Sequence, residues 1–361
     1  MPDNLKNRQF WLQAGTLLAT LTCLGALAKA APLLYQTKAG RIPAIWIGIM
    51  GSREVLDNAG VRGYYEKLLG KFGRMDKHYE YDHSFHIFRF KPNLTWEHDL
   101  VTTNSYGLVG PECSLQKASG SRRVALFGSS LSAGHMVKAN QTFGALLEDR
   151  LNTATPIGPY HHFEVLNIAC ISYTLPQMLD IAAEDAPRFH TDVYLVALDE
   201  LSVSTEWARH LVQITEQGID PKYPFLRDIL HQAKVSKQDS ADTLYGKLAP
   251  YRIPVLRRLL QEFKNTARLH NASLIIALVP SVEAGDLSRR RMSSIRPELD
   301  SLGVPIVDLL DTFAVNLNPA PFAVYPGDVH PNARGHALIF ENLYKGLQAQ
   351  PQAWAALAGE D

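Results

Sequence analysis

A serine stands in a turn of small residues that directly follows a short apolar run. Residues 127–134 read Phe-Gly-Ser-Ser-Leu-Ser-Ala-Gly, and the run 124–127 is typical of a strand buried on both faces. Ser130 lies where such a turn leads into a helix. Its hydroxyl needs only a general base to become a nucleophile, and nearby backbone N–H groups can bind an oxyanion. The same turn also suits a serine that only caps the helix.

A histidine and an aspartate near the other end of the chain supply the complementary chemistry. Residues 327–336 read Gly-Asp-Val-His-Pro-Asn-Ala-Arg-Gly-His, immediately before the last amphipathic stretch. His330 follows Asp328 by two residues, a spacing that suits a general base and the carboxylate that orients it. Ser130, His330 and Asp328 are therefore the candidate catalytic residues.

Alternating strands and helices are expected to position these residues. Short, nearly continuous apolar runs alternate with amphipathic stretches, which favours a doubly wound α/β fold, a three-layer sandwich around a parallel five-stranded sheet. Ligands bind at the carboxyl ends of the strands in such folds. The predicted strands are 124–127, 163–168, 193–198, 274–279 and 304–307, and the predicted helices lie near 141–152, 175–186, 255–270, 287–302 and 334–348.

The chain divides into segments of different character. We expect an irregular N-terminal extension over 31–120 that packs on the main domain, and the hydrolase-like domain over 121–350. Residues 200–255 do not fit the alternation and are interpreted as a helical insertion, and 351–361 as a C-terminal tail.

The first residues form a membrane-directed segment. Lys6 and Arg8 precede an apolar run over 10–28, so 1–30 is predicted to be either a signal peptide cleaved after the Ala-Lys-Ala triplet at 28–30 or an uncleaved membrane anchor. By the positive-inside rule the rest of the chain is expected outside the cytoplasm, in the periplasm or secreted.

Composition excludes several classes. The 361 residues carry 36 Lys and Arg against 36 Asp and Glu without a long basic block, so nucleic acid is not an expected partner. Three cysteines rule out a disulfide scaffold, and Cys113 and Cys170 are interpreted either as a pair or as two buried thiols. The pairs His161-His162 and His83/His86 lack nearby carboxylates at ligand spacing, and the turn over 128–134 fits no nucleotide-binding fingerprint. No metal or cofactor is expected.

The motifs together resemble the SGNH/GDSL hydrolases, in particular exported or membrane-associated bacterial members. The first block of that family is similar to 127–134, with Ser130 at the nucleophile position, and the last block is similar to 328–332. The second and third blocks resemble 165–174 and 197–201, and the resemblance covers about 90–347.

That resemblance implies a Ser-His-Asp triad of Ser130, His330 and Asp328 that hydrolyses an ester. It also implies an oxyanion hole formed by the backbone N–H groups of Ser130 and Ala169 and by the side chain at position 199.

The chain departs from the family pattern at several of these positions. Ser129 replaces the Asp of the GDSL signature, and Ala169 and Ser172 replace glycines of the second block. Asp199 stands where the family has an oxyanion-binding Asn. An ionised carboxylate cannot donate a hydrogen bond, and losing one such donor typically costs on the order of 10²–10³ in rate. Asp328 also lies two residues before the histidine, whereas many members place the acid three before it.

Three functions remain open at this stage. The first is a serine esterase acting on an acyl group of a lipid or a carbohydrate. The second is a non-catalytic SGNH-like domain that binds a glycan or a protein partner, which the departures at Ala169 and Asp199 motivate. The third is acyl transfer to a sugar hydroxyl by the same triad, which differs from hydrolysis only in the nucleophile that resolves the acyl-enzyme.

Overall fold

The computed structural model of the chain describes residues 78–81, 84–96, 100–154, 156–236, 239–282, 285–313, 318–325 and 327–360. The predicted membrane-directed helix over 10–28 lies outside these residues. Within them, no helix combines the length and apolar character needed to cross a bilayer.

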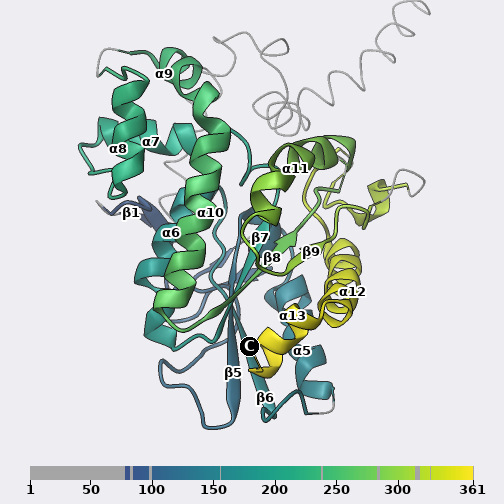
Figure 1. The fold of residues 1–361 in the computed structure, drawn as a ribbon. Helices are drawn as coiled ribbons and strands as arrows, with labels where there is room; N and C mark the ends of the chain where they lie inside the picture. The colour runs from purple at the N-terminus through teal and green to yellow at the C-terminus, as the bar shows by residue number, and fades with distance from the viewer. Residues whose placement is uncertain are drawn as a thin grey trace, which may run out of the picture. The chain divides into compact units, whose positions relative to one another are not determined.

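A five-stranded parallel sheet forms the centre of the domain (Figure 1). All its strands pair in parallel in the order β6-β5-β7-β8-β9, with the first crossover running one way along the sheet and the later ones the other way. Every residue of the two central strands β5 and β7 is buried, which explains their apolar sequences. The predicted fold class is confirmed. The strands are β5 (Ser121–Phe127), β6 (His162–Asn167), β7 (Val193–Leu198), β8 (Ser273–Leu278) and β9 (Ile306–Asp308).

Helices cover both faces of the sheet, each over its own hydrophobic cluster (Figure 1). One cluster contains apolar residues of α6 (Leu175–Glu184), α10 (Arg252–Leu269) and α11 (Gly285–Asp300). The other contains those of α5 (Phe143–Thr153), α12 (Ala333–Ala349) and α13 (Pro351–Ala358). Four 3₁₀ turns complete the described connections: η2 (Ala139–Gln141), η3 (Ala186–Phe189), η4 (Ala249–Tyr251) and η5 (Ala320–Phe322).

Three helices lie between β7 and α10, in the region interpreted as an insertion. They are α7 (Glu206–Glu216), α8 (Pro224–Gln232) and α9 (Ala241–Leu248). Lys222, between α7 and α8, donates hydrogen bonds to Asp180 (2.5 Å) and Glu184 (2.6 Å) of α6, so this helical group is tied to the main domain.

Two small antiparallel hairpins are described in the region of the expected N-terminal extension. They consist of β1 (Tyr79–Tyr81) with β2 (Phe88–Phe90), and β3 (Thr95–Trp96) with β4 (Val101–Thr102). Phe90 and Val101 belong to the same hydrophobic cluster as α6, and the Tyr173 hydroxyl donates to the Phe88 carbonyl at 2.6 Å. These hairpins therefore pack on the sheet domain.

The C-terminal segment interpreted as a tail contains a helix. Within 351–361 the chain forms α13, whose Ala353, Ala356 and Leu357 are buried. Pro351 starts the helix at a position where its missing N–H costs nothing, and Gly359 ends it in a left-handed conformation. The alternation of small apolar residues gave too weak a stripe to predict this packing from sequence.

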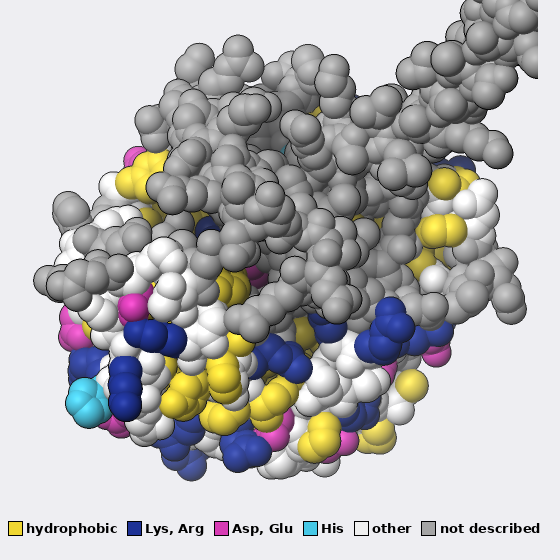
Figure 2. All heavy atoms as spheres, turned by 90° about the horizontal axis from the view of Figure 1, so that it is seen from above, with side chains coloured by type: hydrophobic (Ala, Val, Ile, Leu, Met, Phe, Trp, Pro, Cys, Tyr) yellow, Lys and Arg dark blue, Asp and Glu magenta, His cyan; other side chains and the backbone are white. Residues whose placement is uncertain are grey.

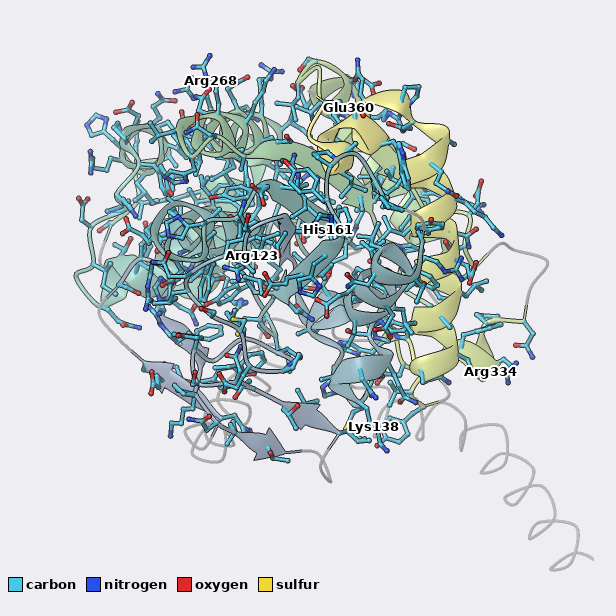
Figure 3. All side chains as sticks on the ribbon, turned by 90° about the horizontal axis from the view of Figure 1, so that it is seen from below. Arg123, Lys138, His161, Arg268, Arg334 and Glu360 are labelled. Carbon is cyan, nitrogen blue, oxygen red and sulfur yellow. The ribbon has the colours of Figure 1, made fainter. Side chains whose placement is uncertain are left out.

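One charged side chain lies inside the domain near the start of the sheet. Arg123 of β5 is 1% exposed (Figure 3). Its guanidinium contacts Glu164 of the neighbouring strand at 2.8 Å and donates to the Leu115 carbonyl at 3.2 Å. The buried charge is thus paired and hydrogen-bonded. Cys113 and Cys170, whose pairing the sequence left open, are free thiols.

Two leucines on α10 provide a matched test of the packing. Leu259 is fully buried, whereas Leu269 is 77% exposed on the same helix. We expect Leu259→Ala to lower the free energy of unfolding by about 2–5 kcal/mol and Leu269→Ala to change it by less than about 0.5 kcal/mol, as measured by urea denaturation. Equal effects of the two substitutions would contradict this placement of α10.

Candidate active site

The turn after β5 places Ser130 at the carboxyl edge of the sheet. Ser130 is the first residue of α4 (Ser130–Ala133), so its backbone N–H has no acceptor within the helix. Gly134 ends this short helix in a left-handed conformation at φ 77°. Gly128 must lack a side chain, because a Cβ there would lie 2.2 Å from the Ser132 Oγ. The small residues of this motif therefore allow the tight turn that presents Ser130.

The loop before α12 holds His330 opposite this turn. Asn332 caps α12 through hydrogen bonds from the Arg334 and Gly335 amides, while its own side-chain amide donates to the Ala323 carbonyl at 2.8 Å. The Val324 amide donates to the His330 carbonyl at 3.0 Å. The residues that follow the histidine in the sequence motif thus fix the loop that carries it.

The three predicted side chains form a continuous hydrogen-bonded chain. Ser130 Oγ lies 2.8 Å from His330 Nε2, and His330 Nδ1 lies 2.7 Å from Asp328 Oδ1. The same Asp328 oxygen accepts the His330 backbone N–H at 2.7 Å. Because a carboxylate only accepts hydrogen bonds, His330 Nδ1 carries the proton and Nε2 is left to accept the Ser130 hydroxyl. The structure thus brings together the three side chains that the sequence analysis selected.

Burial and the neighbouring charges shift the pKa values of His330 and Asp328 in opposite directions. Burial lowers the pKa of His330 below its ordinary value, although the hydrogen bond to Asp328 and the negative charges of Asp328 and Asp199 offset part of that effect. Burial would raise the pKa of Asp328, but its contacts with His330 outweigh burial and hold that pKa below its usual range. Near neutral pH the geometry therefore presents a neutral imidazole beside an ionised carboxylate.

The second predicted oxyanion donor already has an acceptor. The Ala169 backbone N–H, just beyond β6, donates to Asn167 Oδ1 at 3.2 Å. Ala169 does not adopt a positive φ, so the replacement of glycine by alanine causes no backbone strain there. Ser172 does adopt a positive φ, of 67°, a conformation that favours glycine. The Asn167 side chain was not singled out from sequence, because its role depends on the turn that β6 makes at its end.

Asp199 directly follows β7, and both of its carboxylate oxygens accept hydrogen bonds. Oδ1 accepts the Ser202 backbone N–H at 2.9 Å and the Ser202 hydroxyl at 2.8 Å, and Oδ2 accepts the Ser129 hydroxyl. Asp199 is 2% exposed. The carboxylate is thus occupied by serine donors on each side, and its Ser129 contact joins β7 to the turn that carries Ser130.

The residue after Asp199 is a second buried carboxyl group. Glu200 accepts a hydrogen bond from the Ser281 hydroxyl, and burial raises the pKa of Glu200 to about 7. The next residue after Ser281, Val282, donates its amide to the Val329 carbonyl at 3.0 Å. Glu200 therefore supports the backbone beside the loop of His330, a role that sequence patterns did not indicate.

A second histidine lies against the candidate base. The His135 ring packs edge to face on the His330 ring, with 4.7 Å between centroids, and His135 is partly exposed. A positive charge on His135 disfavours a second one on His330. In the sequence, only its position five residues after Ser130 indicates that His135 lies near the candidate site.

Metal ligation finds no support among the described residues, which contain no group of three or more His, Cys, Asp or Glu side chains arranged to hold an ion.

Comparisons with known proteins give structural neighbours only. No protein-family model and no curated protein matches the sequence. Solved structures that resemble it include an acetylxylan esterase from Geobacillus stearothermophilus, at 14% identity and a TM-score of 0.42 over 63% of this chain and 94% of that one. A psychrotrophic esterase from Pseudoalteromonas sp. matches at 12% identity and a TM-score of 0.40, over 63% of this chain and 97% of that one.

A proposed lipolytic protein of the G-D-S-L family from Desulfitobacterium hafniense matches at 11% identity and a TM-score of 0.41, over 62% of this chain and 99% of that one. Of these neighbours, this one carries the G-D-S-L family in its description. Because identity and TM-score are both low, function has to be inferred from the residues of this chain.

The state of the imidazole can be measured directly. We expect His330 to titrate below its ordinary pKa of about 6.5, and Asp328→Asn to lower that pKa further, because the substitution removes the negative charge that favours the imidazolium. NMR titration of the histidine side chains, with His330→Gln to assign the signal, gives both values. A midpoint at or above the ordinary value, or a rise in Asp328→Asn, would contradict the geometry.

Proposed function

We propose that this protein is a serine esterase of the SGNH type, which hydrolyses an ester through an acyl-enzyme on Ser130. The observation that carries the proposal is the unbroken chain of contacts from Ser130 Oγ through His330 to Asp328. A serine that only caps a helix does not need an imidazole as its partner. A buried histidine that is only structural needs one hydrogen-bond partner on each ring nitrogen, and these partners need not be a serine and an aspartate. The arrangement of all three in this order supports nucleophilic catalysis.

Each group has a defined task in this reaction. Ser130 Oγ attacks the ester carbonyl as His330 Nε2 takes its proton, and the tetrahedral oxyanion forms near the Ser130 backbone N–H. Collapse of this intermediate breaks the ester C–O bond, and His330 returns the proton to the leaving alcohol. A water molecule, deprotonated by His330, then releases the acid and restores Ser130. Asp328 keeps Nδ1 protonated and stabilises the imidazolium.

The substrate that we propose is an ester-bearing carbohydrate or lipid. The Lys and Arg side chains on the described part of the face in Figure 2 are interspersed with acidic and hydrophobic ones, which fits a substrate other than a polyanion.

We further propose that residues 1–30 direct the enzyme out of the cytoplasm, and that 10–28 anchor it in the membrane if this segment is not cleaved. In the rest of the chain, 31–120 packs on the domain of 121–350, and 200–255 is an insertion in that domain.

One observation favours a different class of function. The Ala169 amide and the Asp199 carboxylate are both engaged within the protein, so two of the expected oxyanion groups are committed elsewhere. A non-catalytic domain that binds a glycan or a partner would tolerate this. Acyl transfer to a sugar hydroxyl would use the same contacts as hydrolysis, and adding such an acceptor to the assay distinguishes transfer by the ester that it forms.

Hydrolysis of p-nitrophenyl acetate tests the proposal with a matched control. Ser130→Ala should lower kcat by several orders of magnitude, because it removes the nucleophile. Ser132→Ala changes a buried serine of the same turn that forms no part of the hydrogen-bonded series Ser130–His330–Asp328, and it should retain most of the activity. If wild type and Ser130→Ala hydrolyse this ester and an acetylated sugar at the same rate, the binding-domain alternative is favoured.

A further inference from the structure

The contact between Ser129 and Asp199 joins two positions at which this chain departs from the pattern it resembles. Ser129 is fully buried, directly precedes Ser130, and donates its hydroxyl to Asp199. The backbone carbonyl of Ser129 accepts the amides of Ser132 (3.1 Å) and Ala133 (2.9 Å), so this residue is held on both its side chain and its backbone. Movement of Asp199 would therefore displace the turn that presents the nucleophile.

The charge on Asp199 also reaches His330. In the described structure the groups that act on the His330 imidazole include Asp328, His135 and Asp199, and His336 of α12 also interacts with it. The two carboxylates favour the imidazolium, whereas a positive charge on either histidine disfavours it. Asp199 acts without a hydrogen bond to the ring, because its oxygens are taken by Ser129 and Ser202. These three hydrogen bonds, from two serines, compensate the Asp199 carboxylate for the water that burial removes.

We propose that Asp199 is a positioning residue of the esterase: its carboxylate anchors the nucleophile turn through Ser129 and stabilises the charged form of His330, instead of binding the oxyanion. This inference rests on the proposed function. The oxyanion is then bound by backbone donors of the turn. The serine in place of aspartate at 129 and the aspartate in place of asparagine at 199 together move one carboxylate from the first position to the second. The contact requires one carboxylate and one neutral partner, and either position can supply the carboxylate.

This exchange predicts the outcome of a double-mutant cycle on the full chain. Ser129→Asp alone places two carboxylates in contact and should lower kcat/KM roughly 100-fold or more. Asp199→Asn alone removes the charge and the strong acceptor and should lower kcat/KM roughly 10- to 100-fold. Ser129→Asp combined with Asp199→Asn restores one carboxylate and one amide, so its kcat/KM should return to within roughly 10-fold of wild type.

The pKa of His330, followed by NMR, provides a readout that does not depend on turnover. Asp199→Asn should lower this pKa and the double variant should raise it back toward the wild-type value, because the carboxylate is lost and then replaced. Asp180→Asn is the matched control: Asp180 is a buried carboxylate that contacts His86 and Lys222, away from these residues, and its loss should reduce stability without moving the His330 pKa.

The outcomes separate this inference from the proposed function. An increase of kcat/KM in Asp199→Asn would mean that the carboxylate opposes the oxyanion, and would overturn the inference. It is also overturned if Asp199→Asn leaves the His330 pKa unchanged, or if the double variant is no more active than the product of the single effects. Absence of esterase activity in wild type would overturn the proposed function, while the His330 titration still decides the role of Asp199, even if Ser129→Asp fails to fold.

Discussion

The site depends on a buried imidazole that must satisfy a hydrogen bond at each ring nitrogen. Removing His330 from water favours its neutral form, and Asp328 then determines which nitrogen keeps the proton. Only that tautomer leaves Nε2 free to accept the Ser130 hydroxyl. The two sides of the ring are held by segments about 200 residues apart in sequence, so the parallel sheet has to bring the end of β5 and the loop before α12 to the same edge.

The sheet order explains why this edge is available. β5 lies between β6 and β7, so the turn that carries Ser130 has Asn167 and Ala169 on one side and Asp199 on the other. The connection from β5 leads to one side of the sheet and the connection from β7 leads to the other, which opens the carboxyl edge between these two strands. The residues that surround Ser130 are thus determined by strand order. Substitutions at the ends of β6 and β7 change the electrostatics of the site without changing the fold.

Much of this arrangement could be predicted from the sequence, because apolar runs and amphipathic stretches alternate regularly along it. Strands buried on both faces require nearly continuous apolar runs, and the amphipathic stretches between them require helices, so all five strands and the helices α5, α6, α10, α11 and α12 were located. Ser130 was selected because it lies in a turn of small residues after a strand, and His330 and Asp328 because of their spacing of two residues; the resemblance to the SGNH motifs then joined the three. The proximity of Ser130 to His330 then followed from the parallel topology.

The remaining features depend on side-chain contacts that no local pattern encodes. The direction in which Asp199 points is decided by Ser129, 70 residues away, and by the loop that brings Ser202 back to it. The Ala169 amide is occupied because Asn167 turns its side chain along the backbone. His135 lies on His330 because the turn after α4 folds back, and α13 packs through small residues with a weak apolar stripe. Each requires the assembled fold.

The account centres on Ser130 as a nucleophile activated by His330, and covalent labelling with a fluorophosphonate tests this most directly, because the reagent needs an activated serine but no cognate substrate. Peptide mass spectrometry of the labelled full-length protein should find one adduct, on Ser130, that forms more slowly as pH falls through the pKa of His330 and is absent from His330→Gln. Failure of Ser130 to react at any pH, or equal labelling of Ser130 in wild type and His330→Gln, would contradict the account.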